Sequence, residues 1–303
     1  QRHGASGCAC SLKKALHGSE QAGAGWHHTF TEFLKQLGFI RLQSDGCTFI
    51  KRTSERKIII TIHDDDCNIA HSHSPDLDWF LKKIGDKFEC RDEGAINYCL
   101  GMHIIINGHA HGISQEKCIH RMCEKHGVRP SLKPQPPIAP TPDLAAHLDS
   151  PAVDSTKHRA LLGATLHVSC ASRPDISHAI SRLARYSQDP REMHYNVALR
   201  VLKHLANTSS YYMCYGGRNA FKLPLLSAFA DASFGTCKIT GKSTSGCVVM
   251  CNGGPVTWKS QRQTIVATST AECEHVALSD VCRELVCVTQ LAWRSEERRV
   301  RKA

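Results

Sequence analysis

The stretch Leu225-Leu226-Ser227-Ala228-Phe229-Ala230-Asp231-Ala232-Ser233 indicates the fold class, because it sets a single acid within a run of strand-forming composition. Two more strand-like runs follow, residues 245–251 and 255–260. Asn252-Gly253-Gly254 lies between them and tolerates the positive φ of a tight hairpin turn. A helical pattern comes next. The order strand, strand, strand, helix predicts an α+β domain in which one helix accompanies a sheet.

Two glutamates at the start of the helical pattern are candidates to meet Asp231 at one end of the sheet. Glu272 lies three residues after Ser269, the spacing of a capping box, so its carboxylate can instead close the helix end. Glu274 shares a three- and four-residue spacing with Leu278, Val281, Leu285 and Val288. That stripe predicts that Glu274 heads the face packed on the sheet, where a carboxylate needs a partner.

Two carboxylates at one place are enough to begin holding a divalent cation. We therefore expect Asp231 and Glu274 to be metal ligands, with Glu272 as the alternative to Glu274. The chemistry that this arrangement suggests is metal-assisted cleavage of a phosphodiester.

A second acidic cluster is His63-Asp64-Asp65-Asp66, between the strand-like residues 57–62 and 67–70. The β-branched composition of the first run predicts a buried strand, and the second run can return beside it as a hairpin. Taken alone, three acids at a hairpin tip are more typical of a solvated turn than of a metal site.

Composition limits the classes of function. The 303 residues are enough for two domains with hydrophobic cores, and the net charge of +10 fits a protein that binds a polyanion. A membrane-spanning apolar run and a secretory leader are both absent from the sequence, so we expect a cytoplasmic or nuclear protein with no membrane partner. The 16 cysteines and 19 histidines lack the spacing of structural zinc sites, and reduced thiols are expected.

Prolines divide the chain. Residues 129–151 hold seven of the twelve prolines and predict an extended linker. Two amphipathic stretches follow it, and each carries basic residues on one side: Arg182 and Arg185, then Arg200 and Lys203. These side chains either contact the phosphates of a nucleic acid or belong to ordinary solvated helix faces. The charge run at residues 295–303 is typical of a solvated tail of foreign sequence.

Four ordered motifs resemble the ribonuclease H domain of copia-type LTR retrotransposon polyproteins: Ala230-Asp231-Ala232, Lys242-Ser243-Thr244-Ser245-Gly246, Gly254-Pro255-Val256-Thr257-Trp258-Lys259-Ser260 and Ser269-Thr270-Ala271-Glu272. Earlier segments resemble the reverse transcriptase of the same family, whose palm hairpin carries Tyr-Val-Asp-Asp: Leu12-Lys13-Lys14-Ala15-Leu16-His17-Gly18, Gln21-Ala22, Trp26, Tyr98-Cys99-Leu100-Gly101-Met102 and Ile113-Ser114-Gln115-Glu116-Lys117. The resemblance runs from about residue 11 to about residue 294.

The resemblance implies an α+β chain in which a partial palm and thumb precede a partial ribonuclease H-like mixed sheet with one helix. The implied segments are a palm remnant (1–128), the Pro-rich linker (129–151), a helical thumb or connection (152–220), a partial ribonuclease H domain (221–294) and the tail. Asp65 and Asp66 are implied to be palm ligands, and Asp231 and Glu274 nuclease ligands, for Mg²⁺ or Mn²⁺. The implied partners are an RNA/DNA hybrid or primer-template duplex and the remaining Pol segments.

Departures from the family pattern predict that the chain is inactive. His63 stands where Tyr is usual, and Asp64 adds a third negative charge beside Asp65 and Asp66. The resemblance also implies one further Asp for each centre, which we expect to be missing. Polymerase and hybrid-ribonuclease activities are thus ancestral. The alternatives are a non-catalytic basic remnant that binds nucleic acid and an unfolded pseudogene product.

Overall fold

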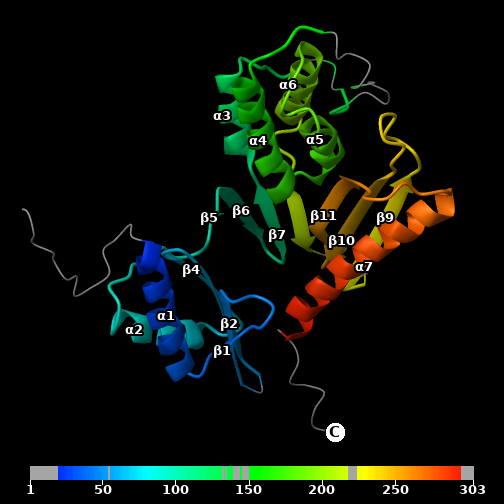
Figure 1. Cartoon of the computed structure of the whole chain (residues 1–303). Helices are drawn as coiled ribbons and strands as arrows, with labels where there is room; N and C mark the ends of the chain where they lie inside the picture. The colour runs from blue at the N-terminus through cyan, green and yellow to red at the C-terminus, as the bar shows by residue number, and fades with distance from the viewer. Residues whose placement is uncertain are drawn as a thin grey trace, which may run out of the picture. The chain divides into compact units, whose positions relative to one another are not determined.

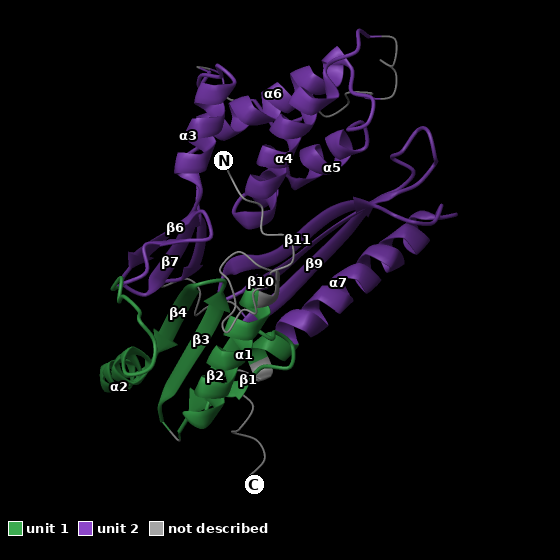
Figure 2. Cartoon of the chain, turned by 60° about the vertical axis from the view of Figure 1, so that its left-hand side comes forward, with its two compact units in different colours: residues 1–94, 290–303 green, residues 95–289 purple. Residues whose placement is uncertain are grey.

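A computed structural model of the chain describes residues 20–53, 55–131, 133, 135–138, 144, 150–217 and 224–294. It is a mixture of helices and antiparallel sheets, in agreement with the α+β class (Figure 1). The chain forms two compact units, one of residues 1–94 and 290–303 and the other of residues 95–289 (Figure 2). The motif at residues 12–18 and the tail at 295–303 lie outside the described residues.

The first unit packs two helices on one face of a sheet. Strands β1 (Ile40–Arg41), β2 (Thr48–Arg52), β3 (Lys57–His63) and β4 (Asp66–His71) follow one another in the sheet in chain order. Every second residue of β3 is buried, as the pleat of a strand with one covered face requires. The core holds these isoleucines together with aromatic residues of α1 (Glu20–Gln36) and α2 (Ser74–Gly85), including Phe30, Phe33 and Phe80.

The second unit begins with a sheet that joins distant parts of the chain. Its strands are β5 (Tyr98–Cys99), β6 (Met102–Asn107), β7 (Ala110–Ser114) and β8 (Met213–Gly216), in that order. β7 pairs antiparallel with β8, so that Ala110 lies opposite Gly216. The boundary between the two compact units, after Gly94, falls inside the predicted palm segment 1–128. The pairing of β7 with β8 accounts for this boundary, because it joins residues after 94 to segments much later in the chain.

Helices form the middle of the second unit: α3 (Glu116–Lys125), α4 (Ser155–Ala171), the 3₁₀ turn η1 (Pro174–Ile176), α5 (Ser177–Ala184) and α6 (Glu192–Asn207). Their facing sides share one apolar core, which contains Leu161, Ile180 and Leu202. The described residues of the Pro-rich segment contain no helix or strand. They bind α6, since Arg200 donates a hydrogen bond to the Pro136 carbonyl and Leu144 is buried in the core.

The last sheet has the order β11-β10-β9, formed by β9 (Leu226–Ser233), β10 (Thr244–Cys251) and β11 (Gly254–Arg262). Asn252 at φ 51° and Gly253 at φ 83° make the turn between β10 and β11, where the sequence predicted a turn that needs positive φ. Helix α7 (Thr270–Arg294) covers one face of this sheet (Figure 1). Three strands and a helix therefore follow one another as the sequence predicted.

One feature of α7 differs from the prediction. Its most buried residues are Cys273, Ala277 and Val281, whereas Glu274 is exposed and Leu278 is 54% exposed. The expected stripe is therefore wrong at its first two positions, Glu274 and Leu278, whereas Val281 is buried as expected. Small side chains at 273 and 277 let the helix approach the sheet closely, and the Gln263 amide donates a hydrogen bond to the Cys273 carbonyl there.

Candidate functional site

The two faces of the β9–β11 sheet have different neighbours. On β11, Thr257 and Lys259 bond to Glu284 of α7, and Gln261 bonds to Asp280 of the same helix. Residues between them point to the opposite face, because side chains alternate along a strand. There the Trp258 indole N–H donates a hydrogen bond to the Ser169 carbonyl of α4.

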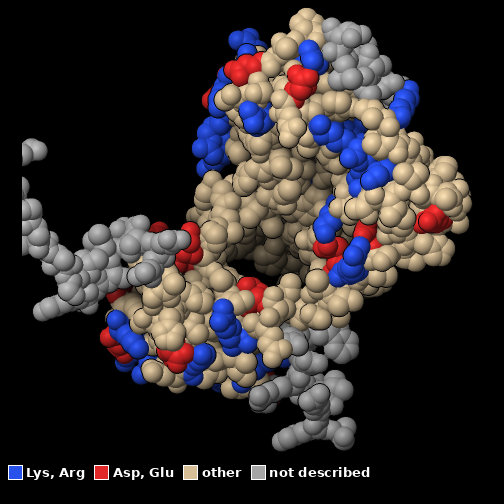
Figure 3. Space-filling model, viewed as in Figure 1, with Lys and Arg blue, Asp and Glu red and all other residues tan. Residues whose placement is uncertain are grey.

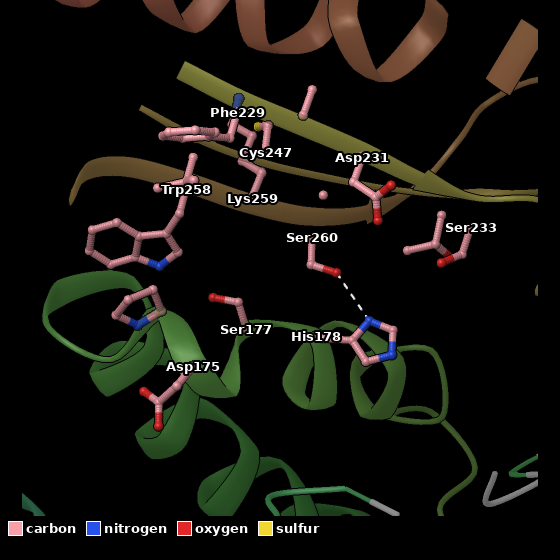
Figure 4. A pocket seen from close by; sticks show the side chains of 15 residues that line it. Asp175, Ser177, His178, Phe229, Asp231, Ser233, Cys247, Trp258, Lys259 and Ser260 are labelled. Carbon is pink, nitrogen blue, oxygen red and sulfur yellow. Dashed lines mark hydrogen bonds between the residues drawn. The ribbon is translucent and has the colours of Figure 1, made fainter. Parts of the chain in front are cut away.

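Asp231 lies on the face away from α7. It pairs across β9 and β10 with Gly246, which in turn pairs with Ser260 of β11, and directly opposed residues share a face. The Ser260 hydroxyl lies 3.3 Å from Nδ1 of His178 on α5. Figure 4 shows the Asp231 carboxylate on the same side of the sheet as this pair.

These side chains line a cavity of about 410 Å³ between the sheet and the turn that leads into α5. Its sheet wall includes Phe229, Asp231 and Trp258, and its helical wall includes Ser177 and His178 (Figure 4). The Phe229 ring is 61% exposed. The cavity thus combines an acid, an imidazole and hydroxyl groups with an accessible aromatic ring.

The surroundings of His178 disfavour the protonated form of its imidazole. Burial lowers the pKa of His178, and the neighbouring guanidinium groups of Arg182 and Arg185 lower it further. The lowered pKa favours the neutral imidazole, which can accept a hydrogen bond but is a weaker base than a free imidazole. The Asp231 carboxylate has no hydrogen bond or ion pair with any described residue, so its oxygens are available to a cation or to a ligand.

At the start of α7, Glu272 acts as a helix cap. Its carboxylate accepts hydrogen bonds from the backbone N–H and the hydroxyl of Thr268, at 2.6 and 2.8 Å. The Ser269 hydroxyl accepts one from the Glu272 N–H at 3.1 Å. The bonds from Thr268 lower the pKa of Glu272. The capping alternative predicted a bond back to Ser269, and the carboxylate binds the preceding residue instead. Glu274 has no such bond and faces solvent.

The second acidic cluster forms the tip of the β3–β4 hairpin. His63 pairs with Asp66, and Asp64 and Asp65 form the two-residue turn, with Asp64 at φ 48°. All three acids are exposed, and His63 Nε2 lies 3.8 Å from Asp64 Oδ2. The predicted hairpin is confirmed. The side chains of Asp65 and Asp66 are open to solvent and to any ligand that approaches the tip.

The basic residues chosen from the sequence lie in two environments. Arg182 of α5 and Arg185, which directly follows α5, both lower the pKa of His178. Burial lowers the pKa of Arg185, and repulsion from the charge of Arg262 lowers it further. Arg200 of α6 is bonded to the Pro-rich segment, and Lys203 of α6 is exposed. The four basic residues thus differ in their surroundings, and their contact with nucleic acid stays a prediction.

Sequence reasoning missed His178, Ser260 and Trp258 as a group. Trp258 and Ser260 lie two residues apart on β11, and His178 lies on α5, about eighty residues earlier in the chain. Nothing in the sequence around each residue indicates that the three side chains meet. The sequence also missed Tyr98, which lines a second cavity with three residues of α3. In the part of the chain that the structure describes, no group of three or more His, Cys, Asp or Glu side chains could hold a metal ion.

Comparison with known proteins decides the family. The sequence model described as reverse transcriptase (RNA-dependent DNA polymerase) matches residues 1–140. The chain is 27% identical over 286 residues, 91% of its length, to a retrovirus-related Pol polyprotein from transposon TNT 1-94 of Nicotiana tabacum, and 26% identical over 93% of its length to one from transposon RE1 of Arabidopsis thaliana. The chain belongs to the copia-type retrotransposon Pol polyproteins.

The Pol chain spans about a fifth of those two relatives, 21% and 19% of their lengths. It is also 26% identical to a putative transposon Ty5-1 protein of Saccharomyces cerevisiae, with 90% of the chain and 89% of that protein covered. No solved structure matches it. Within the described residues, the Pol chain has no helix that is both long and apolar enough to cross a membrane.

The carboxylates of the Pol chain suit the metal that its family implies. Mg²⁺ and Mn²⁺ prefer oxygen ligands, and Asp65, Asp66, Asp231 and Glu274 each present a carboxylate that is exposed to solvent. Glu272 fits less well, because Thr268 already donates two hydrogen bonds to it. Asp231 lies on the face of the sheet away from α7, whereas Glu274 belongs to α7, so the structure does not bring these two carboxylates to the same face. Glu274 is available because it is exposed and not because it is buried.

Proposed function

We propose that this Pol chain supplies parts of two nucleic-acid-processing centres, an RNA-directed DNA polymerase and a ribonuclease acting on RNA/DNA hybrids, and that alone it binds nucleic acid without completing either reaction. The observation that carries the nuclease half is the free Asp231 carboxylate, held on a rigid strand beside a neutral imidazole in an accessible cavity. Its sheet neighbours Gly246 and Ser260 leave room above it, since neither has a large side chain.

Each protein group has a distinct role in this proposal. Asp231 provides carboxylate oxygens for a divalent metal, which when bound would activate the attacking oxygen and stabilise the leaving one. Glu274, the second carboxylate proposed as a metal ligand, belongs to the helix on the opposite face of the sheet and does not line this cavity. The exposed Phe229 ring offers a surface on which a base or sugar can pack. His178, hydrogen-bonded to Ser260, is placed to hold a proton near the phosphodiester.

The polymerase half rests on the β3–β4 hairpin. Its two-residue turn presents Asp65 and Asp66 at the end of a strand that is anchored in the core by Ile58, Ile60 and Ile62. Asp64 adds a third negative charge to the tip, and mutual repulsion of three carboxylates opposes the binding geometry that two would give. We propose that this repulsion, together with the need for a further carboxylate in each centre, keeps the isolated chain inactive.

Hydrolysis of a labelled RNA/DNA hybrid by the purified chain, in Mg²⁺ and separately in Mn²⁺, tests the proposal. We expect no cleavage above that of the Asp231→Asn variant. Metal-dependent cleavage that disappears in Asp231→Asn would show that the chain is an active nuclease and would contradict the proposed inactivity. Primer extension with Asp65→Asn as the matched variant tests the polymerase half in the same way.

A second candidate is a purely nucleic-acid-binding protein, favoured by the net charge of +10. Under this alternative, Asp231→Asn and Glu274→Gln leave hybrid affinity unchanged or raise it, with or without Mg²⁺. Under the main proposal, Mg²⁺ strengthens hybrid binding by the wild type and not by these variants. An unfolded product is distinguished from both by a thermal melt without a cooperative transition.

A further inference from the structure

A second cavity of the second unit lies apart from the site at Asp231. It has a volume of about 590 Å³, and its walls are Tyr98 of β5 with Lys117, His120 and Arg121 of α3. This volume is in the range of pockets that hold small organic ligands. One wall is an aromatic ring, and the other is a helix face that carries positive charge.

Tyr98 is held rigidly although its side chain is 49% exposed. It pairs with His103 across a hairpin whose turn is Leu100-Gly101. Both turn residues have positive φ, 50° and 79°, as the tightest two-residue hairpin turns require. An exposed ring on a fixed backbone offers a flat apolar surface to a ligand, and it loses little conformational entropy when the ligand binds.

The helix face opposite Tyr98 is positive. Lys117, Arg121 and Lys125 recur every four residues along α3, so they form one stripe, and all three are exposed. None of them has an ion pair with a described residue. Figure 3 shows Lys and Arg side chains along the outer side of α3.

The acidic residues of α3 are Glu116 and Glu124, and neither forms an ion pair with Lys117, Arg121 or Lys125. Glu116 Oε1 lies 4.0 Å from Nε2 of His120, and that nitrogen is 3.2 Å from the Ser209 hydroxyl. Glu116 and His120 therefore belong to a neighbouring row of the helix. Lys117 and Arg121 keep their charge available beside the Tyr98 ring.

We propose that Tyr98, Lys117 and Arg121 form a binding site for single-stranded nucleic acid, in which a base stacks on Tyr98 and the adjoining phosphates contact the two cations. Stacking on an aromatic ring beside basic side chains is the physical signature of single-strand binding without sequence preference. A double helix would present phosphates to the cations but no exposed base face to the ring. The inference rests on the proposed nucleic-acid function and adds a site for an unpaired strand.

The test measures the affinity of the full chain for a fluorescent oligothymidylate by anisotropy over a range of salt concentrations. Tyr98→Ala should weaken binding about tenfold, whereas Tyr98→Phe, which keeps the ring, should bind like the wild type. Lys117→Gln/Arg121→Gln should lower the slope of log affinity against log salt by about 1.4, since each phosphate contact to a single strand contributes about 0.7. Lys82→Gln/Lys83→Gln on α2 removes the same charge elsewhere and should leave the slope unchanged.

Three results would overturn the site. One is equal binding by Tyr98→Ala and Tyr98→Phe, and another is an equal loss of slope in the two double glutamine variants. The third is displacement of the oligonucleotide by polyglutamate at the same concentration as by unlabelled oligonucleotide, which would indicate an acidic polypeptide as the partner. If the wild type binds no nucleic acid at all, the proposed function fails as well. Melting curves of each variant exclude unfolding as the cause of a loss.

Discussion

The Arg173 guanidinium donates hydrogen bonds to both carboxylate oxygens of Asp175, at 2.9 and 2.6 Å. Arg173 is only 3% exposed, and it also donates hydrogen bonds to the carbonyl and the hydroxyl of Thr208 at the end of α6. His204 of α6 lies 2.9 Å from the same carboxylate. The short Arg-Pro-Asp sequence thus joins the end of α4 to α6 in front of the Asp231 cavity.

Replacing Asp175 with Asn should lower the free energy of unfolding by about 2 kcal/mol, because it leaves the buried Arg173 charge without its counter-ion. This is less than for a fully buried pair, since Asp175 is 40% exposed and solvent screens part of the interaction. Urea denaturation followed by circular dichroism measures the change. Asp189→Asn is the matched control, since Asp189 is 68% exposed and pairs with Arg191 at the surface. It should cost less than about 1 kcal/mol. Equal costs for the two variants would contradict a special role for the buried pair.

The same pair predicts a dependence on acid. Burial alone raises the pKa of Asp175, but hydrogen bonds from Arg173 and His204 outweigh it and hold the pKa well below its ordinary value of 3.8. The unfolded chain therefore binds this proton at a higher pH than the folded chain. The stabilisation is fully present above the unfolded pKa of 3.8 and is lost progressively as the pH falls from there toward the lower folded pKa. Unfolding curves at decreasing pH should converge for the wild type and Asp175→Asn.

His158 should make the helical core sensitive to mild acid. Its side chain is fully buried, and neither ring nitrogen has a hydrogen-bond partner among the described residues. Burial lowers its pKa, and the charge of His194 lowers it further. As the pH falls, the unfolded state takes up this proton before the folded state does. The contribution of His158 to the free energy of unfolding is therefore fully present above about pH 6.5. At lower pH the free energy of unfolding decreases by at most about 1.4 kcal/mol per pH unit.

Urea denaturation of the wild type between pH 7.5 and pH 5, at intervals of about half a unit, measures this slope. His158→Phe should flatten it by removing the titrating group while filling the space. His109→Gln, at an exposed position, should leave the slope as it is. A slope that persists unchanged in His158→Phe would assign the acid sensitivity to another group.

We expect the two glutamates at the start of α7 to have different roles: Glu272 stabilises the helix, and Glu274 binds a metal. Glu272→Ala removes two capping hydrogen bonds and should destabilise the fold more than Glu274→Ala does. Glu274→Ala removes an exposed side chain and should change stability by less than about 0.5 kcal/mol. Binding of Mn²⁺, followed by electron paramagnetic resonance, should weaken in Glu274→Ala and persist in Glu272→Ala. The reverse pattern would move the metal ligand to Glu272.

Cys237 should be a thiolate near neutral pH. Burial raises the pKa of a thiol, but the Thr240 hydroxyl, the Arg262 guanidinium and backbone N–H groups bond to the sulfur and lower its pKa to about 6. The ultraviolet absorbance of the thiolate, taken as the difference between wild type and Cys237→Ser, reports this titration. Arg262→Gln should move the midpoint up toward 9, and Arg283→Gln, on the outer side of α7, should not. An unmoved midpoint in Arg262→Gln would remove the guanidinium as a cause.

The pattern of residues within short stretches of the sequence predicted those strands and helices that pair or pack with the next element along the chain. The β3–β4 hairpin and the run from β9 to α7 follow from alternation, β-branched residues and turn glycines, because each strand pairs with the next. Which side of α7 is buried did not follow, since both candidate rows contain apolar residues and only the close approach at Cys273 and Ala277 chooses between them.

The candidate site was accessible to sequence reasoning only in part. Asp231 could be chosen because an acid in a strand is unusual, and the family motifs supported it. His178 could not, because its contact with Ser260 depends on how α5 packs on a sheet formed more than fifty residues later. Pairings of this kind are set by the shape of the whole core and leave no periodic signal in the chain.

The pairing of β7 with β8 has a consequence for synthesis of the protein. When Ser114 leaves the ribosome, about a hundred residues remain to be made before β8 exists, which takes about 5–20 s at ordinary elongation rates. During that interval the hydrogen-bonding groups on one side of β7 lack their native strand, and such an edge readily pairs with other chains. Soluble expression should therefore depend on whether the chain extends to Gly216, and a chain cut at residue 128 should aggregate.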